Sequence, residues 1–290
     1  MQAPGKTHSF NIRFSNQRKL GAKTNLYFLS HFVAEALVGC IASRRSSMIP
    51  KLISVCGRSQ TGVSRPFLCE AQDGNMYYVK GANVVAEQLV FEYVFGRLAE
   101  ECGLPVAPVH VVEIPKQLAA YAVLDHKEDF QPGLAFGSRR IQFSEDIRSS
   151  HIRSIHEETR LRVLCFDWWT RNPDRCLDRL GGDPNLLWDP VLQSVFLIDH
   201  DRCLAEDFDP DEFKRQHAFI DSRPFLEKSF FEKWRTKFES AVYGLKRIWD
   251  EIPPEWLSDS SGIERISVRR QDVEAQLMKP EFPIEGILPT

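Results

Sequence analysis

The sequence lacks the cysteine and histidine patterns that mark a disulfide framework or a zinc site. Its seven cysteines are widely scattered, and no Cys-x-x-Cys pair occurs among them. Its eight histidines include no His-x-x-x-His pair. Disulfide-stapled domains and zinc knuckles are therefore not indicated.

Dense runs of lysine or arginine are also missing, and the formal net charge is only −3. A chain with this balance has no general attraction to nucleic acid or to an anionic membrane surface, so neither partner is expected. The usual phosphate-loop patterns, Walker A and G-x-G-x-x-G, are absent as well. The remaining composition is ordinary for a soluble globular protein, with 43% hydrophobic and 27% charged residues. A length of 290 residues suits one two-lobed domain or two small ones.

The first 47 residues differ from the rest of the chain. Basic residues precede an apolar run over residues 26–41, which is the arrangement of a secretory signal. His31 and Glu35 interrupt this run, and a charged side chain is costly inside a membrane segment. We expect residues 1–47 to be an extension of the main domain, either a docking helix or the product of a start codon assigned before Met48. Export or anchoring is the alternative.

A predicted β-hairpin after the middle of the chain carries the clearest chemical signal. Residues 186–188 and 195–198 are apolar, and an Asp-Pro turn sequence separates them. A hairpin returns its end beside its start, so we expect Asn185 and Asp199 at the same edge of the sheet. Two oxygen ligands brought together in this way suit Mg²⁺ bound between phosphates.

The loop before this hairpin contains Asp174, within an Asn-Pro-Asp-Arg sequence. An Asp in a loop, an Asn that opens a strand and an Asp that closes the partner strand follow the order in which kinases assemble a base and two metal ligands. The spacing from Asp174 to Asn185 exceeds the roughly five positions of a protein-kinase catalytic loop, so Asp178 is an alternative base. Asp201 is likewise an alternative metal ligand to Asp199.

The region upstream is predicted to supply a phosphate-binding loop and a lysine. Strands are expected at residues 52–56, 66–70 and 76–80, with turns between them. The turn after the first strand is rich in Gly and Ser, which lets backbone N–H groups approach an anion. The third strand ends on Lys80, in the place of the lysine that holds the ATP phosphates in a kinase small lobe. The candidate nucleotide-binding residues are Gly57, Gly62, Ser64 and Lys80.

A helix is predicted over residues 82–102, because apolar residues recur there at intervals of three and four. Gly103 provides its C-terminal stop and Pro105 prevents its continuation. Glu92 lies on this helix beside part of the apolar face. Because the helix follows directly after the strand that ends at Lys80, we expect Glu92 to pair with Lys80.

Taken in order, these motifs resemble the HipA-like kinases. Phosphatidylinositol kinases share a similar Asp-Arg, Asn and Ile-Asp arrangement more distantly. The resemblance extends from about residue 48 to about residue 250. The residues that carry it are 61–67, 78–80, Glu92, 103–106, 135–138, 166–169, 172–175, 184–188 and 198–200.

The resemblance implies an α+β, two-lobed protein-kinase-like fold, with ATP between a small β-rich lobe and a larger, mainly helical lobe. The small lobe is expected at residues 48–125, and the large lobe with its C-terminal helices at residues 126–290. Residues 113–125 are expected to form the last strands of the small lobe and the crossing to the large lobe, and residues 127–138 are expected to form a loop. A buried helix over residues 149–169 would lead into the loop that contains the base.

The resemblance also assigns roles to the candidate residues. Lys80 would bind the α- and β-phosphates of ATP, and Glu92 would orient it. Asp174 would accept the proton of the attacking hydroxyl, while Asn185 and Asp199 would hold Mg²⁺. Positioning and charge neutralisation supply most of the barrier reduction in phosphoryl transfer.

The functional expectation is an ATP- and Mg²⁺-dependent phosphotransferase whose acceptor is a Ser or Thr hydroxyl of a protein. The alternatives are a lipid or small-molecule kinase, and a catalytically weak pseudokinase that acts as a binding module. The need for ATP predicts a cytoplasmic protein and argues against export. The sequence specifies neither an oligomeric state nor a regulatory partner.

Overall fold

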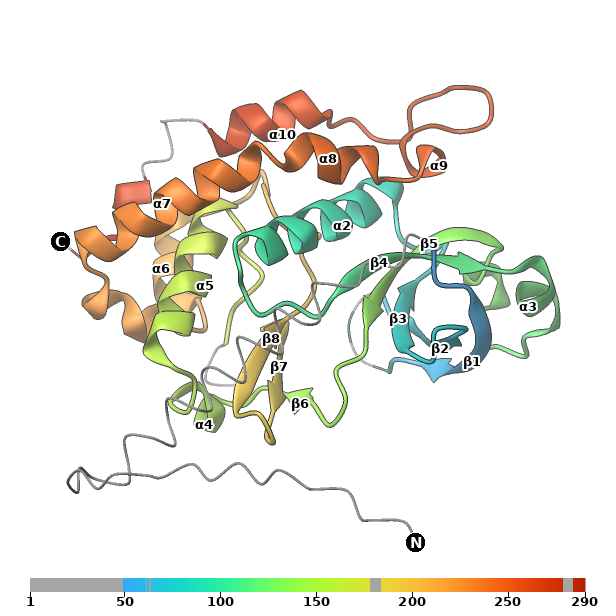
Figure 1. Ribbon diagram of the computed structural model, residues 1–290, viewed down its shortest axis with the longest axis horizontal. Helices are drawn as coiled ribbons and strands as arrows, with labels where there is room; N and C mark the ends of the chain where they lie inside the picture. Colours follow the sequence, from blue (N-terminus) through green and yellow to red (C-terminus); the bar gives the residue numbers. More distant parts are fainter. Residues whose placement is uncertain (1–48, 61, 63, 178–183, 279–283, 290) are drawn as a thin grey trace, which may run out of the picture. The chain divides into compact units, whose positions relative to one another are not determined.

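Five antiparallel strands form the first part of the structure (Figure 1). The computed structural model describes residues 49–60, 62, 64–177, 184–278 and 284–289, so the predictions for residues 1–47 and for Asp178 lie outside the described residues. The strands are β1 (Leu52–Arg58), β2 (Phe67–Ala71), β3 (Met76–Lys80), β4 (Val109–Ile114) and β5 (Gly133–Arg139), in the order β1-β2-β3-β5-β4. The three strands predicted before residue 81 are confirmed, and β3 has the predicted bounds.

The alternation of side chains along β3 determines which way Lys80 points. Tyr77 and Val79 are buried in a core cluster on one face of the sheet, together with Phe67. Successive side chains of a strand point to opposite faces, so Lys80 points to the other face. Its partner across the sheet, Phe136 of β5, belongs to the cluster that also contains the next helix of the chain.

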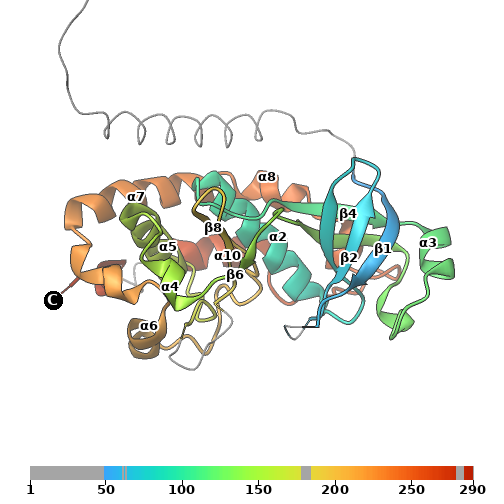
Figure 2. The same ribbon diagram turned by 90° about the horizontal axis from the view of Figure 1, so that it is seen from below.

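Two short helices separate β4 from β5. They are α3 (Lys116–Tyr121), which packs beside β1 (Figure 2), and the 3-10 helix η1 (Lys127–Asp129). After them the chain returns to the sheet as β5 between β3 and β4, and it leaves the sheet only after Arg139.

Strand β5 corrects two expectations. The loop predicted at residues 127–138 is wrong, because most of this stretch is η1 and β5. Within residues 113–125, the expected strand is present only as the end of β4, and the expected crossing is wrong, because α3 follows and the sheet continues after it with β5. The sheet therefore extends beyond the boundary expected at residue 125. The strand was missed because one of its two partners, β3, is distant in sequence.

Helix α2 (Ala86–Glu101) lies against the sheet and falls within the range predicted for it. Its backbone approaches β4 closely at Gly96, where a Cβ would lie only 2.8 Å from Cγ1 of Val109. The helix ends before Gly103, whose φ of +71° is a conformation that glycine adopts without steric cost. The predicted C-terminal stop is confirmed.

Helices make up most of the chain after β5. They are α4 (Ser149–Ile152), α5 (Glu157–Trp169), α6 (Pro210–Gln216), α7 (Lys228–Val242), α8 (Leu245–Asp250), α9 (Pro254–Leu257) and α10 (Arg270–Leu277), with the 3-10 helices η2 (Ile220–Phe225) and η3 (Ile284–Ile287). The helix predicted over residues 149–169 is interrupted, because His156 has an extended ψ of 135°. This break directs the neighbouring Ile155 into the core.

A second, three-stranded sheet contains the predicted hairpin. It consists of β6 (Glu145–Asp146), β7 (Leu186–Asp189) and β8 (Ser194–Leu197), all antiparallel. The expected fold, an antiparallel β-rich part followed by a mainly helical part, is therefore present. None of the helices in the described residues has the length and apolar character needed to span a membrane.

Candidate functional site

A buried ion pair joins β3 to α2. Lys80 Nζ contacts Glu92 Oε1, and the two residues are only 6% and 1% exposed. The pair follows from the local sequence, because Lys80 ends the strand and Glu92 lies on the helix that comes next. The expected proximity of these two side chains is present in the structure.

Two further carboxylates approach the same lysine from the loop after β8. Asp199 Oδ1 lies 3.3 Å and Asp201 Oδ2 lies 3.7 Å from Lys80 Nζ. Between them, the backbone N–H of His200 donates to Glu92 Oε2 at 2.7 Å. Glu92 therefore connects the lysine to the loop that carries both aspartates.

The hairpin brings Asn185 close to Asp199, as its predicted geometry requires. Leu186 pairs with Leu197 across β7 and β8, and the N–H of Ile198 donates to the Asn185 carbonyl at 3.1 Å. Asn185 and Asp199 both have a left-handed backbone, with φ of +53° and +54°. Asn and Asp are the non-glycine residues that tolerate this conformation best.

Asp174 is held against the start of the hairpin. The Asn185 side-chain amide donates from Nδ2 to Asp174 Oδ2 at 2.8 Å. The Asn172 side chain accepts from the N–H of Asp174 at 3.0 Å, which closes a tight turn before it. The long sequence spacing between Asp174 and Asn185 thus does not separate their side chains.

The Arg175 side chain connects this loop to the backbone at both ends of the hairpin. Its Nη1 donates to the carbonyl oxygens of Asn185 at 2.7 Å and Ile198 at 3.3 Å. Its Nε donates to Asp167 Oδ2 at 2.7 Å, and neither charged side chain is exposed. A single guanidinium therefore fixes the backbone on either side of the cluster.

Asp167 and His217 complete this supporting layer, and sequence reasoning did not assign a role to either. His217 Nε2 lies 3.0 Å from Asp167 Oδ2, although 50 positions separate them. Asp167 lies within one of the family-like motifs, but nothing in its neighbourhood indicates its partners. His217 has no local signal, because only the folded chain brings α6 to the end of α5.

The glycine-containing loop after β1 is close to the chain that leaves β3. Asn83 Nδ2 donates to the carbonyl of Ser64 at 3.0 Å, and Arg58 Nε donates to the carbonyl of Arg65 at 2.8 Å. Gly57 lies within β1 and pairs with Leu68, Gly62 has a φ of +76°, and no described residue lies within 4 Å of the Cβ position of either glycine. In the described part of the chain, no direct contact joins Gly57, Gly62 or Ser64 to the lysine cluster.

The sequence matches the profile of a family described as HipA-like kinase over residues 52–282. The chain belongs to the HipA-like kinase family. This membership bears out the predicted two-lobed kinase fold and makes the protein a kinase-like phosphotransferase, a class that uses ATP and a divalent metal.

Solved structures similar to this HipA-like kinase include a Helicobacter pylori proinflammatory kinase, CtkA. The two share 11% identity at a TM-score of 0.44, over 77% of this chain and 92% of that chain. The FAT and kinase domain of CtTel1 shares 15% identity at a TM-score of 0.30, over 81% of this chain and 22% of that chain. A comparison with curated proteins finds no match.

The donor atoms of this HipA-like kinase suit a hard divalent cation. Carboxylate oxygens of Glu92, Asp199 and Asp201 all lie within 4.8 Å of one another. Glu92 already accepts from Lys80 and from the His200 backbone, which leaves Asp199 and Asp201 as the better placed ligands. Oxygen ligands of this kind favour Mg²⁺ or Ca²⁺ over softer metals.

The charged groups of the cluster shift one another's pKa values. Burial disfavours the charged form of Lys80, but three neighbouring carboxylates outweigh it and raise the lysine pKa. Burial and the charge of Asp199 raise the pKa of Asp201 to about 6. Burial and the same aspartate raise the pKa of Asp174, although the hydrogen bond from Asn185 opposes this. A carboxylate with a raised pKa is a stronger proton acceptor.

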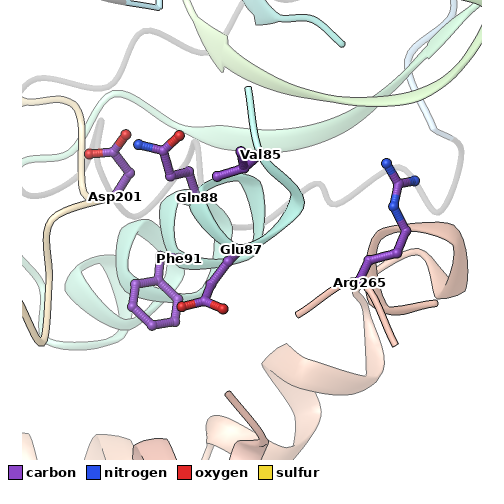
Figure 3. A pocket seen from close by; sticks show the side chains of 6 residues that line it. All are labelled: Val85, Glu87, Gln88, Phe91, Asp201 and Arg265. Atoms are coloured by element: carbon purple, nitrogen blue, oxygen red, sulfur yellow. The ribbon is translucent and has the colours of Figure 1, made fainter. Parts of the chain in front are cut away.

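Two cavities border the cluster. The first has a volume of about 490 Å³ and is lined by Val85, Glu87, Gln88, Phe91, Asp201 and Arg265. Figure 3 shows Asp201 beside Gln88, with Arg265 reaching in from the C-terminal region. The second has a volume of about 450 Å³, and its lining includes Lys80 and Trp256. Solvent-sized space therefore reaches both the lysine and one of the aspartates.

Proposed function

We propose that this HipA-like kinase transfers the γ-phosphoryl group of ATP, with Mg²⁺, to a Ser or Thr hydroxyl of a protein. The observation that carries the proposal is the contact of Lys80 with Glu92 on one side and Asp199 on the other. In protein kinases the corresponding lysine–glutamate pair and metal-binding aspartate must both be in place for catalysis. Here they meet within one buried cluster.

Lys80 is proposed to bind the α- and β-phosphates of ATP. Its ammonium is charged at neutral pH, because the surrounding carboxylates raise its pKa. Glu92 holds the ammonium in position and is itself held by the His200 backbone N–H. The lysine is therefore oriented before nucleotide binds, which reduces the entropy lost on binding.

Asn185 and Asp199 are proposed to hold Mg²⁺, with Asp201 next to them as a further carboxylate. When bound there, Mg²⁺ would supply positive charge that neutralises the charge that develops on the phosphates during transfer. The Asn185 side-chain nitrogen donates to Asp174 Oδ2, and the side-chain oxygen is the atom proposed to bind the cation. Arg175 fixes the backbone of Asn185 and of the residue before Asp199.

Asp174 is proposed to be the base that accepts the proton of the attacking hydroxyl. Its hydrogen bond with Asn185 places it beside the proposed metal ligands, which supports a catalytic loop despite its extra length. Its raised pKa suits proton transfer from an alcohol. Gly57, near the end of β1, and Gly62 and Ser64, in the loop after it, are proposed to cover the phosphates, since no described residue lies within 4 Å of the Cβ position of either glycine.

A protein hydroxyl as the acceptor is proposed from the family resemblance. The test is incubation with γ-labelled ATP and Mg²⁺ in the presence of a general protein acceptor such as casein, followed by mass spectrometry of the products. We expect Mg²⁺-dependent label on Ser or Thr that is lost in Asp199→Asn and retained in Asp211→Asn, an exposed aspartate outside the cluster. Label that appears only on lipids or small molecules would contradict the proposed acceptor, and no Mg²⁺-dependent label on any acceptor would indicate a pseudokinase.

A further inference from the structure

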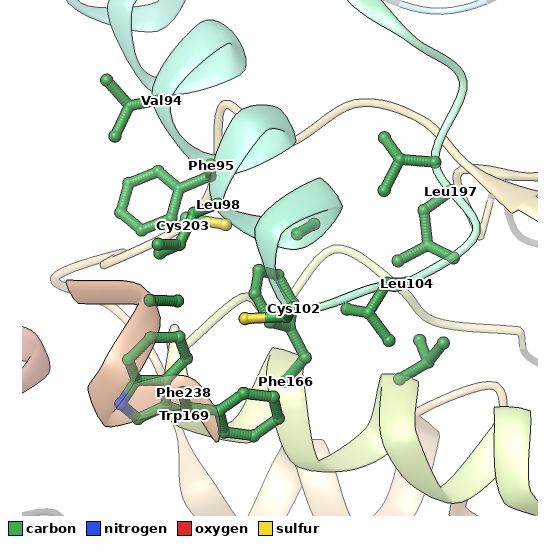
Figure 4. Packing of buried hydrophobic residues seen from close by; sticks show 14 of the residues in the cluster. Val94, Phe95, Leu98, Cys102, Leu104, Phe166, Trp169, Leu197, Cys203 and Phe238 are labelled. Atoms are coloured by element: carbon green, nitrogen blue, oxygen red, sulfur yellow. The ribbon is translucent and has the colours of Figure 1, made fainter. Parts of the chain in front are cut away.

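The C-terminal part of the chain holds helix α2 from the side opposite the sheet. We call residues 247–267, which include the end of α8, all of α9 and the loop after it, the C-terminal brace. Helix α2 contacts α8 and α9, and Figure 1 shows α8 alongside it. A further face of α2 is packed in the main core, where Figure 4 shows its side chains near those of α5 and α7. The brace therefore occupies the remaining face of the helix that carries Glu92.

The middle of α2 is tied to the brace by a buried arginine and a tyrosine. Glu251 Oε2 accepts from the Tyr93 hydroxyl at 2.8 Å and pairs with Arg97 Nη1 at 3.0 Å. Arg97 is only 6% exposed, and a charge buried to this extent requires a charged or hydrogen-bonding partner. Glu251 thus supplies one of the charged partners that the buried Arg97 side chain of α2 requires.

Trp256 anchors the brace between α2 and the sheet. Its indole Nε1 donates to the Leu134 carbonyl of β5 at 2.9 Å. Its ring meets the Tyr93 ring edge to face, with centroids 6.4 Å apart, and the residue is 3% exposed. One side chain therefore touches both the helix that carries Glu92 and the strand that pairs with β3.

The brace also reaches both ends of α2. At the start, the backbone N–H and the hydroxyl of Ser267 donate to Glu87 Oε2 at 3.0 and 2.8 Å. At the end, Arg247 Nη2 pairs with Glu101 Oε1 at 2.6 Å. The helix has no side-chain cap at its start and no basic residue in its last turn, so its own sequence does little to stabilise its ends.

We propose that the C-terminal brace fixes α2 on the sheet so that Glu92 stays paired with Lys80, with Glu251 and Trp256 as positioning residues for that pair. Glu92 touches Lys80 and the His200 backbone at the same time, so a rotation or shift of α2 would break both contacts. In protein kinases the placement of the equivalent helix controls activity. In this chain a covalently attached segment provides that placement. The catalytic consequence of the inference rests on the proposed function, whereas the holding of α2 does not.

The test compares amide hydrogen exchange in α2 with exchange in α5, using the full chain and two mild variants. Glu251→Gln removes the brace's charge beside Arg97 and leaves Glu100 of α2 as the other carboxylate that pairs with it, and Trp256→Phe keeps a ring but removes the N–H donor. Lys246→Gln is the matched control, because Lys246 lies on α8 and pairs with Asp250 of the same helix. Urea unfolding of each variant reports global stability separately. ATP affinity by calorimetry and turnover by the label assay complete the measurements.

We expect amide hydrogen exchange in α2 to become about tenfold faster in Glu251→Gln. The free energy contributed by a hydrogen bond to a charged group is large enough to change an equilibrium constant by about this factor. Trp256→Phe should act in the same direction, while exchange of α5 and the Lys246→Gln protein stay as in the parent. ATP binding and turnover should weaken together in the two brace variants. Unchanged exchange of α2 in both would overturn the inference, and so would faster exchange with unaltered ATP affinity. If the parent protein transfers no phosphoryl group, the proposed function fails. The inference about the brace is then still decided by two measurements, the hydrogen exchange of α2 and the affinity for ATP.

Discussion

Loss of the Arg175 side chain tests how the catalytic loop is supported. Replacement by Met removes the guanidinium that donates to Asp167 and to the carbonyls of Asn185 and Ile198, while it keeps similar volume. Asp167 would then be left as a fully buried carboxylate whose side-chain partners among the described residues are His217 and the more distant Asn172 amide. Removal of one partner of a buried ion pair costs about 3–5 kcal/mol, because the remaining charge is uncompensated.

That cost is a large part of the total stability of a domain, which is about 5–15 kcal/mol. Urea unfolding at neutral pH, followed by tryptophan fluorescence, should therefore show a clearly lower midpoint with little change in the slope. The matched control is Arg235→Met, since Arg235 pairs with Glu232 and Glu239 on the exposed face of α7. An exposed pair contributes only about 0–1 kcal/mol, so the control should unfold almost as the parent does.

The pH dependence of stability provides a second test of the Arg175→Met replacement. Burial alone would raise the pKa of Asp167, but Arg175 and His217 outweigh it and lower the pKa. The contribution of this carboxylate is therefore complete above its unfolded pKa and is lost as the pH falls through the lower folded pKa. Without Arg175 the buried Asp167 carboxyl group is protonated more readily. The difference in free energy of unfolding between the parent and the variant should therefore become smaller as the pH is lowered. If Arg175→Met lowers the free energy of unfolding by less than about 1 kcal/mol at neutral pH, as expected for loss of an exposed ion pair, the reasoning is refuted.

Three further predictions concern the proposed site and the N-terminus. Asp199→Asn should abolish Mg²⁺-dependent phosphotransfer while circular dichroism and thermal unfolding stay near those of the parent, and near-normal turnover would remove Asp199 from the site. Asp174→Ala should lower turnover far more than ATP affinity measured by calorimetry, because a base acts in the transition state. If Asp178→Ala is the damaging change instead and Asp174→Ala is mild, the assignment of the base is reversed. A chain that starts at Met48 should remain soluble and bind ATP as well as the full chain, because every proposed site residue follows it. Aggregation or weaker binding would show that the kinase part requires residues 1–47.

The parts of the structure that were predictable are those that local sequence determines. Strand β3 and helix α2 follow from periodicities of two and of three to four residues. Their adjacency alone suggests that Lys80 meets Glu92. The hairpin that brings Asn185 to Asp199 is equally local, since a turn of fixed geometry links its two strands.

The parts that were missed depend on contacts between distant segments. Strand β5 pairs with β3, more than fifty residues earlier in the chain, so its short apolar stretch resembles a loop until its partners are known. Asp167 and His217 meet only when α6 reaches the end of α5. The interruption of the helix predicted over residues 149–169 depends on the core that receives Ile155, which no local pattern specifies.

The left-handed backbone at both ends of the hairpin restricts how these positions can drift during evolution. At φ near +54°, glycine fits without a steric penalty, asparagine and aspartate are the best tolerated of the other residues, and β-branched replacements are strongly disfavoured. Two of these three residue types carry a side-chain oxygen at the right length for a cation. Chain geometry at Asn185 and Asp199 thus favours some residue types over others before any selection for activity acts. The favoured types include those that a metal site needs.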